Sequence, residues 1–219
     1  MDWSRSIDLY CERTDTSFWA EPVNAISNLA FLIAAGFAYT HWRRNGGRDM
    51  PALLLILLVA AIGIGSFIFH TVATLGAELF DVVPIALFIY AYLVLALRRF
   101  LGASWPVIVG TLAVFAGVSY ADAALTAPET LNGSHQYLPA LAAMAVVGLA
   151  VRRRPSGPPV LTGAAVFLVS IAFRSIDNAV CPVLPLGTHF LWHCLNACVL
   201  YLLLCAAMAD PGGKLRPSE

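Results

Sequence analysis

The chain of 219 residues is 59% hydrophobic and only 12% charged, whereas a soluble domain usually carries about 25% charged residues. This composition excludes an ordinary soluble domain and indicates a protein that lies in a lipid bilayer. The formal net charge is zero, and no basic cluster is interleaved with aromatic residues, so nothing indicates a nucleic-acid partner. The five cysteines fit no zinc-finger spacing.

The sequence predicts a single all-α membrane domain over residues 1–219. Residues 1–23 form a polar, acidic segment without the features of a cleavable signal peptide, so we expect the first span to act as its own insertion signal. A helix needs about 20 apolar residues to cross a bilayer. The apolar runs predict a bundle of seven transmembrane helices at about 24–42, 51–72, 79–97, 104–121, 136–151, 159–177 and 187–208.

The basic residues are unevenly divided between the two sides of this predicted bundle. Ten Lys and Arg residues lie in the links after spans one, three and five and in the C-terminal tail, which holds Lys214 and Arg216. The N-terminal segment and the other links hold two, Arg5 and Arg13. Because Lys and Arg favour cytoplasmic links, we predict the N-terminus outside and the C-terminus in the cytoplasm.

Polar residues within or beside the spans gather in the outer half of the bilayer. They are Glu21, Asn24, Ser66, His70, Asp81, Arg174, Asp177, His189 and His193. An ionisable residue inside a membrane costs roughly 2.5–3.5 kcal/mol on insertion scales and usually faces a bundle interior or a water-filled cavity. The inner halves of the spans are almost purely apolar, so this one-sided group predicts a functional site in the outer leaflet.

The last span begins with His189 and His193, which are four residues apart and therefore share a helix face. This spacing suits two ligands of one metal ion, although interfacial histidines and haem ligands show it too. His70, in the outer half of the second span, can supply a third imidazole. Three histidines with an open fourth position are typical of a catalytic zinc.

Two further residues in the group suit the chemistry of such a metal. Asp81 can orient a ligand histidine, or it can hold the metal-bound water and act as general base and then acid. Ser66, four residues before His70, can donate a hydrogen bond to a developing oxyanion. A nucleophilic serine is less favoured because no base stands beside it.

Other reactive side chains have simpler interpretations. Arg174 and Asp177 are three residues apart and are expected to form a structural ion pair. His41 is expected at the cytoplasmic interface as an anchor, and His135 is expected to be solvated in a polar loop.

The cysteines fall into two groups. Cys194, Cys198 and Cys205 are expected to pack as small residues in the last span. Cys11 and Cys181 both fall outside, where disulfides persist, and a bridge between them is predicted. It would hold the N-terminal segment against the helix that carries the histidine pair.

Several motifs follow one another in a distinctive order along nearly the whole chain. They are Tyr10-Cys11-Glu12, Ala20-Glu21-Pro22-Val23-Asn24-Ala25-Ile26-Ser27-Asn28, Gly65-Ser66-Phe67-Ile68-Phe69-His70, Asp81, and the pair His189 and His193. Together they resemble the alkaline ceramidase family. That family belongs to a wider group of seven-span metal-dependent hydrolases that includes the adiponectin receptors.

The resemblance implies a zinc ion held by His70, His189 and His193, with Ser66 and Asp81 as the family's serine and aspartate. It also implies hydrolysis of the ceramide amide to sphingosine and a fatty acid. The leading hypothesis is therefore an intramembrane zinc amidase that acts on a lipid amide by zinc-activated water, with ceramide as the best single candidate.

The resemblance further maps a calcium site onto Asp8, Glu12 and Glu21, which offer hard oxygen ligands. The chain is shorter than eukaryotic members and rich in Ala, Leu and Gly, which suggests a bacterial source. In that case the protein would lie in the inner membrane with its site facing the periplasmic leaflet. In a eukaryote, the expected location is the luminal side of the endoplasmic reticulum or Golgi membrane.

Other functions remain open at this point. A seven-span receptor or sensor with a structural zinc would need the same histidines, and so would a hydrolase of another lipid amide or ester. A haem bound by two histidines would leave Ser66 and Asp81 unexplained. The sequence does not indicate an oligomeric state.

Overall fold

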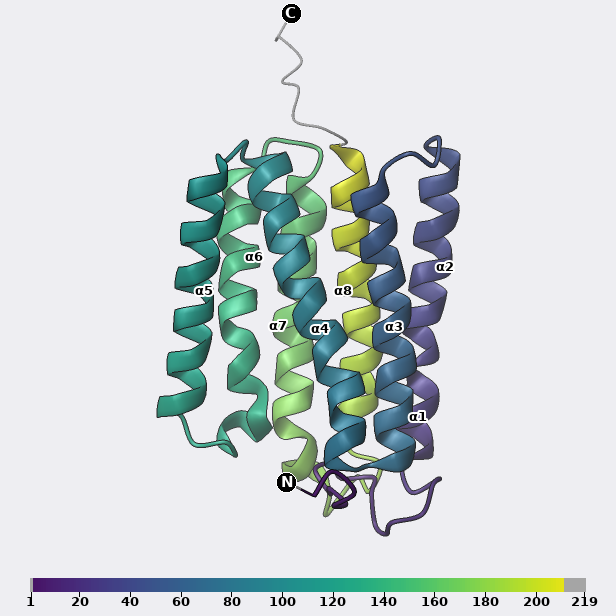
Figure 1. The fold of residues 1–219 in the computed structure, drawn as a ribbon. Helices are drawn as coiled ribbons and strands as arrows, with labels where there is room; N and C mark the ends of the chain where they lie inside the picture. Colours follow the sequence, from purple (N-terminus) through teal and green to yellow (C-terminus); the bar gives the residue numbers. More distant parts are fainter. Residues whose placement is uncertain (1, 211–219) are drawn as a thin grey trace, which may run out of the picture.

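The computed structural model of the chain describes residues 2–210, and its regular elements are helices (Figure 1). The α-helices are α1 (Pro22–Ser27), α2 (Leu29–Arg44), α3 (Met50–Val72), α4 (Leu75–Leu95), α5 (Trp105–Leu125), α6 (Leu138–Ala150), α7 (Gly157–Val180) and α8 (His189–Ala209). A π-helical turn, η1 (Ala96–Phe100), continues α4, and a 3-10 segment, η2 (Thr130–Tyr137), precedes α6. The predicted all-α class is confirmed for the described residues.

Within residues 2–210, six helical segments are long and apolar enough to cross a membrane, as expected of a multi-pass membrane protein. They are Pro22–Arg44, Met50–Val72, Leu75–Phe100, Trp105–Leu125, Gly157–Val180 and His189–Ala209. The predicted fifth span corresponds to α6, whose 13 residues are fewer than the about 20 that a transmembrane helix usually has. The seven-span topology therefore stays a prediction.

Helices α2 to α8 alternate in direction, so their links fall at two opposite ends of the bundle (Figure 1). We call the first the histidine end; it contains the N-terminal segment and the links at 73–74, 126–137 and 181–188. We call the second the arginine end; it contains the links at 45–49, 101–104 and 151–156. Lys214 and Arg216 lie outside the described residues, and the orientation of the bundle in a membrane stays a prediction.

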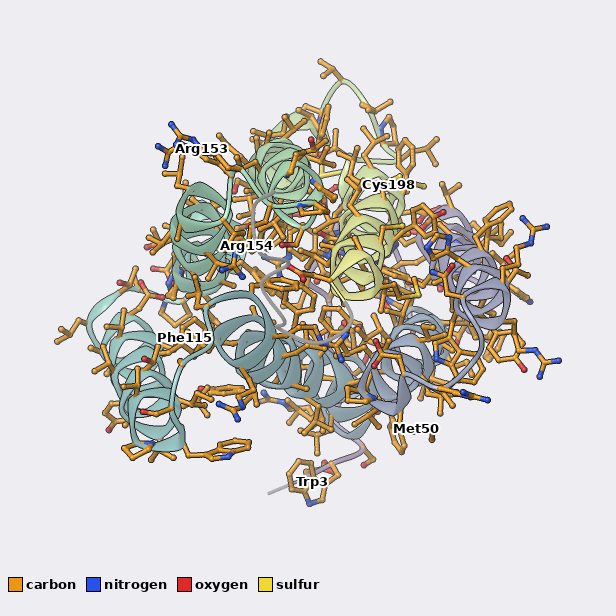
Figure 2. The ribbon with its side chains drawn as sticks, turned by 90° about the horizontal axis from the view of Figure 1, so that it is seen from above. Trp3, Met50, Phe115, Arg153, Arg154 and Cys198 are labelled. Atoms are coloured by element: carbon orange, nitrogen blue, oxygen red, sulfur yellow. A yellow bond between two sulfur atoms is a disulfide. The ribbon has the colours of Figure 1, made fainter. Side chains whose placement is uncertain are left out.

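The arginine end is fastened by hydrogen bonds from arginines to neighbouring helices. Arg99 donates to both carboxylate oxygens of Asp49, at 2.6 and 2.9 Å, and to the carbonyl of Ala207 at 2.8 Å. In the view along the bundle, Arg154 lies over the helices whereas Arg153 points away from them (Figure 2). Arg154 donates to the carbonyl of Phe100. These bonds satisfy carbonyls at helix ends that have no partner within their own helix.

The link between α3 and α4 is shorter than the sequence suggested. Ala73 adopts a left-handed conformation (φ 45°) that ends α3, and the side chain of Thr74 accepts the backbone N–H of Ala77 at 3.2 Å. This cap starts α4 four residues before the predicted span, with Glu78 in its first turn, where a negative charge is favourable.

Helices α3 and α4 come into backbone contact at Gly65. A Cβ atom at this position would lie only 1.8 Å from the carbonyl oxygen of Phe80. The close approach matters for the site because Ser66 and Asp81 are the residues that directly follow these two. A glycine at this point therefore allows the serine and the aspartate to come to the same level of the bundle.

Gly65→Ala is expected to destabilise the protein by about 1–3 kcal/mol, because the added methyl group forces α3 and α4 apart. The matched control is Gly117→Ala on α5, where an added Cβ meets nothing within 4 Å. That change is expected to be neutral or slightly stabilising, since alanine is the better helix former. Thermal unfolding in detergent measures both, and equal melting temperatures for the two variants would contradict the contact.

Candidate active site

Three buried histidines meet at the histidine end of the bundle. His70 lies in the last turn of α3, and His189 and His193 lie in the first two turns of α8. Their exposed fractions are 0%, 2% and 2%, and their ring centroids are 4.6–5.2 Å apart. One nitrogen of each lies within 4.8 Å of the others, and no other group of this kind occurs among residues 2–210.

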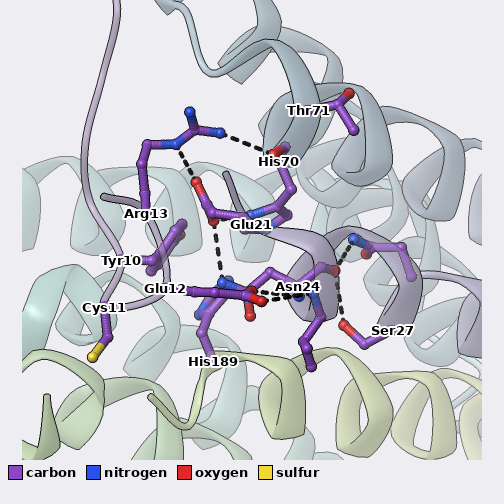
Figure 3. A network of polar contacts seen from close by, with 12 residues as sticks. Tyr10, Cys11, Glu12, Arg13, Glu21, Asn24, Ser27, His70, Thr71 and His189 are labelled. Carbon is purple, nitrogen blue, oxygen red and sulfur yellow. Dashed lines mark hydrogen bonds and ion pairs between the residues drawn. The ribbon is translucent and has the colours of Figure 1, made fainter. Parts of the chain in front are cut away.

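Hydrogen bonds fix the ring orientation of two of these histidines. His70 Nδ1 lies 2.6 Å from Glu21 Oε2, and His193 Nδ1 lies 2.7 Å from the hydroxyl of Ser27. The Ser27 hydroxyl donates its own hydrogen to the carbonyl of Asn24 (Figure 3), so it accepts from His193. In the neutral form of the two rings, both Nδ1 atoms are therefore donors, and both Nε2 atoms carry lone pairs.

The two Nε2 atoms of His70 and His193 face each other at 3.1 Å. Two lone pairs at this distance repel, and a cation bound by both removes the repulsion. The third ring, that of His189, has a buried Nδ1 with no hydrogen-bond partner in the described part of the chain. The three residues therefore fit a metal ion in their donor chemistry and in the polar atom that they leave unsatisfied.

His189 is held in place from two sides. Asp177 Oδ1 accepts the backbone N–H groups of Thr188 at 2.6 Å and of His189 at 2.9 Å, and so caps α8. The imidazole of His189 stacks on the ring of Tyr10, with centroids 3.6 Å apart. The N-terminal segment thus forms one wall of the histidine group.

The predicted ion pair between Arg174 and Asp177 is wrong. Asp177 is fully buried, and its second oxygen, Oδ2, accepts a hydrogen bond from the backbone N–H of Cys11 at 3.0 Å. Gly187, which has a φ of +62°, packs so closely against this carboxylate that no side chain would fit there. Three backbone N–H groups satisfy the carboxylate, so it needs no cation.

Arg174 instead binds the N-terminal segment and the link before α6. Its guanidinium donates to the carbonyl of Asn132, to the hydroxyl of Ser134 and to the hydroxyl of Tyr10. It also lies 5.5–5.9 Å from the ring centroids of three aromatic residues, Tyr10, Tyr137 and Trp192.

His135 is also placed differently from the expectation that it is solvated. It is 3% exposed, and its Nδ1 lies 2.8 Å from Asp122 Oδ2. The link folds back under the end of α5, which buries the imidazole against that carboxylate. His41 is exposed near the end of α2, and Cys198 is an exposed free cysteine on α8.

The predicted disulfide between Cys11 and Cys181 is confirmed, with the two Cα atoms 5.5 Å apart. It fastens the N-terminal segment to the end of α7. The next residue, Glu12, accepts the backbone N–H groups of Val23 at 2.7 Å and Asn24 at 2.8 Å at the start of α1 (Figure 3). Both contacts hold the polar segment over the histidine group.

The structure does not gather the predicted calcium ligands into one site. Asp8 is exposed, Glu12 caps α1, and Glu21 binds Arg13 and His70. Burial alone raises the pKa of Glu21, but hydrogen bonds from His70, Arg13 and Asn24 outweigh it and hold this pKa below its ordinary value. The carboxylate of Glu21 is therefore charged at neutral pH, and its oxygens already accept hydrogen bonds from protein side chains. Calcium binding stays a prediction.

Ser66 and Asp81 line a cavity together with His193. Ser66 is 2% exposed, and Oδ1 of Asp81 is buried without a hydrogen-bond partner among the described residues. Most of the remaining lining is apolar or aromatic, and it reaches Leu203 on α8. At 1.5 Å per residue, Leu203 lies about 15 Å along the helix from His193. The cavity thus joins a polar end to a long apolar one.

Sequence reasoning missed the residues that hold the histidines. The contacts of Ser27, Arg13 and Tyr10 with the histidines are tertiary, and spacing along the sequence does not predict them. Ser27 and Tyr10 do occur in motifs of the family resemblance, which was the available signal.

These features define a multi-pass helical membrane protein with a buried three-histidine group suited to a metal and an apolar cavity beside it. The model of the Ceramidase family matches residues 5–210, so the chain belongs to this family and the resemblance is confirmed. No curated protein matches the chain. Family membership supports a ceramidase-like hydrolase that acts on amide bonds.

If the three histidines bind a metal ion, Ser27→Ala is expected to weaken that binding by about 10- to 100-fold, because His193 loses the acceptor that fixes its ring. The matched control is Ser175→Ala on α7, where the hydroxyl bonds only a carbonyl of its own helix. Competition with a chromophoric chelator measures both affinities. Wild-type affinity in a folded Ser27→Ala variant would contradict the assigned tautomer.

Proposed function

We propose that the protein is an intramembrane zinc-dependent amidase that cleaves ceramide, or a closely related lipid amide, into a long-chain base and a fatty acid. One observation carries this proposal. The Nε2 atoms of two histidines face each other, and one of these histidines lines an apolar cavity together with Asp81, whose buried Oδ1 has no partner among the described residues.

His70, His189 and His193 are the residues that would hold the metal. A zinc ion bound by three imidazoles supplies a Lewis acid that polarises a carbonyl and activates water near neutral pH. The protein's own contribution is to keep Nε2 of His70 and His193 free for it. Glu21 and Ser27 do this by occupying the Nδ1 atoms of these two rings.

Asp81 is the proposed proton carrier. Hydrolysis of an amide adds a hydroxyl group from water to the acyl carbon and breaks the C–N bond, and the departing nitrogen needs a proton. A carboxylate that takes the proton from water and returns it to nitrogen completes this balance. Ser66, which lines the same cavity, is proposed to donate a hydrogen bond to the carbonyl oxygen as its charge grows.

The apolar part of the cavity is proposed to hold a hydrocarbon chain of the substrate. Its lining includes Phe88, Phe115 and Leu203, and it leads away from the polar end along α8. A chain buried there would bring the amide to the histidine group without leaving the bilayer. This arrangement favours lipid amides over soluble amides, because only a lipid amide has a long apolar chain whose burial in the cavity is favourable in free energy.

The proposed topology has seven spans, with α6 as a short fifth one, and places the histidine end outside. The alternation of helix direction and the arginines at the opposite end support it. In a bacterium, the site would then open to the periplasmic leaflet of the inner membrane.

The test is release of fatty acid from ceramide by the purified, zinc-loaded protein, followed by mass spectrometry. Asp81→Asn is expected to lower kcat by about 10²–10⁴-fold, the usual contribution of a general acid–base group. The matched control is Asp122→Asn, which alters a carboxylate bonded to His135 away from the cavity lining, and which should keep kcat near wild type.

Two results would count against the proposal. Undiminished release by Asp81→Asn would remove Asp81 from the reaction. Absence of release by wild type from ceramide and from other long-chain amides and esters, with zinc bound, would favour the receptor or sensor function.

A further inference from the structure

A buried arginine from the N-terminal segment lies directly behind the histidine group. Arg13 is only 6% exposed, and Figure 3 shows its hydrogen bonds to Glu21 and to the main chain of His70. Nε donates to Glu21 Oε1, Nη1 to the carbonyl of Asp15 at 3.1 Å, and Nη2 to the carbonyl of His70 at 2.9 Å. Each nitrogen of the guanidinium therefore has an acceptor within the protein.

Arg13 reaches His70 by two routes. Through Glu21, whose other oxygen lies 2.6 Å from Nδ1, it is linked to the imidazole ring. Directly, it binds the main-chain carbonyl of His70, which belongs to the last turn of α3. Carbonyls in that turn lack donors within the helix, and a positive charge there is favourable. Ring and backbone of this histidine are thus fixed by one side chain.

The oxygens around this guanidinium are of the kind that a hard cation selects. One carboxylate and two main-chain carbonyls are typical ligands of calcium. In this chain the guanidinium of Arg13 binds all three oxygens. The disulfide at Cys11, two residues earlier in the chain, holds this part of the N-terminal segment in place. Unlike a bound metal ion, a charged side chain cannot dissociate, and the planar guanidinium fixes the direction of each hydrogen bond.

From these contacts we infer that Arg13 is the positioning residue for His70, and that it makes the metal site independent of calcium. The inference rests on the proposed metal-dependent function of the site. Arg13 holds one oxygen of Glu21, which leaves the other oxygen to accept from Nδ1 of His70 and so directs Nε2 towards the metal.

The experiment compares wild type with Arg13→Met, which keeps much of the apolar stem and removes the charge, and with Arg13→Lys, which keeps a charge without the fork. The control is Arg5→Met, an exposed arginine of the same segment. The readouts are zinc affinity by chelator competition, melting temperature, and fatty acid release from ceramide, each with and without millimolar calcium.

Zinc affinity is expected to fall at least about tenfold in Arg13→Met, to fall less in Arg13→Lys, and to be unchanged in Arg5→Met. Calcium is expected to leave the zinc affinity, melting temperature and activity of wild type unchanged. Reduced melting temperature without reduced zinc affinity in Arg13→Met would make the arginine a structural residue only. Activation or stabilisation of wild type by calcium would overturn calcium independence.

These outcomes are separate from those that test the proposed function. If wild type binds zinc but releases no fatty acid, the amidase proposal fails, whereas the effect of Arg13 on zinc affinity is still measured. If wild type is active and Arg13→Met binds zinc normally, only the role of Arg13 fails.

Discussion

The structure depends on one electrostatic constraint, the burial of imidazoles whose lone pairs converge. His70 and His193 place their Nε2 atoms 3.1 Å apart in a region closed to solvent, an arrangement that a bound cation stabilises. Each ring is locked by an acceptor at Nδ1, and those acceptors are themselves satisfied by other groups of the N-terminal segment and of α1. A buried polar network of this kind is stable only when each member has its partners, which explains why a short polar segment is fastened by a disulfide, a helix cap and a buried arginine.

The same constraint separates the two ends of the cavity. Polar groups gather where the N-terminal segment can satisfy them, and the walls further along α8 are left to apolar and aromatic residues. Gly65 allows α3 and α4 to come into backbone contact at the level of Ser66 and Asp81, and both of these residues line the cavity together with His193. A lipid amide fits such a cavity because its two parts match the two environments: an apolar chain along the bundle and one polar bond beside the histidines.

Much of this could be predicted from the sequence, because polar residues stand out against an apolar background. His70, His193 and Asp81 were found in this way, and the bundle follows from the apolar runs. The partners of these residues could not be found, because the N-terminal segment has no periodicity to show which carboxylate meets which helix. Helical spacing suggested an ion pair for Asp177, but three backbone N–H groups bind its carboxylate instead. Gly187 makes this possible because it has no side chain to keep the backbone away from the carboxylate. The start of α4 was misplaced because a single side-chain cap outweighs the local polarity.

Elemental analysis of the purified protein tests directly whether the three histidines bind one metal ion. About one zinc per chain is expected in wild type, because the three histidines form a single site. That zinc is expected to be lost when His70, His189 and His193 are all changed to alanine and the variant remains folded. Metal-free wild type after purification in zinc-containing buffer would show that the histidines do not bind the metal, and so would full retention of zinc by the folded triple variant.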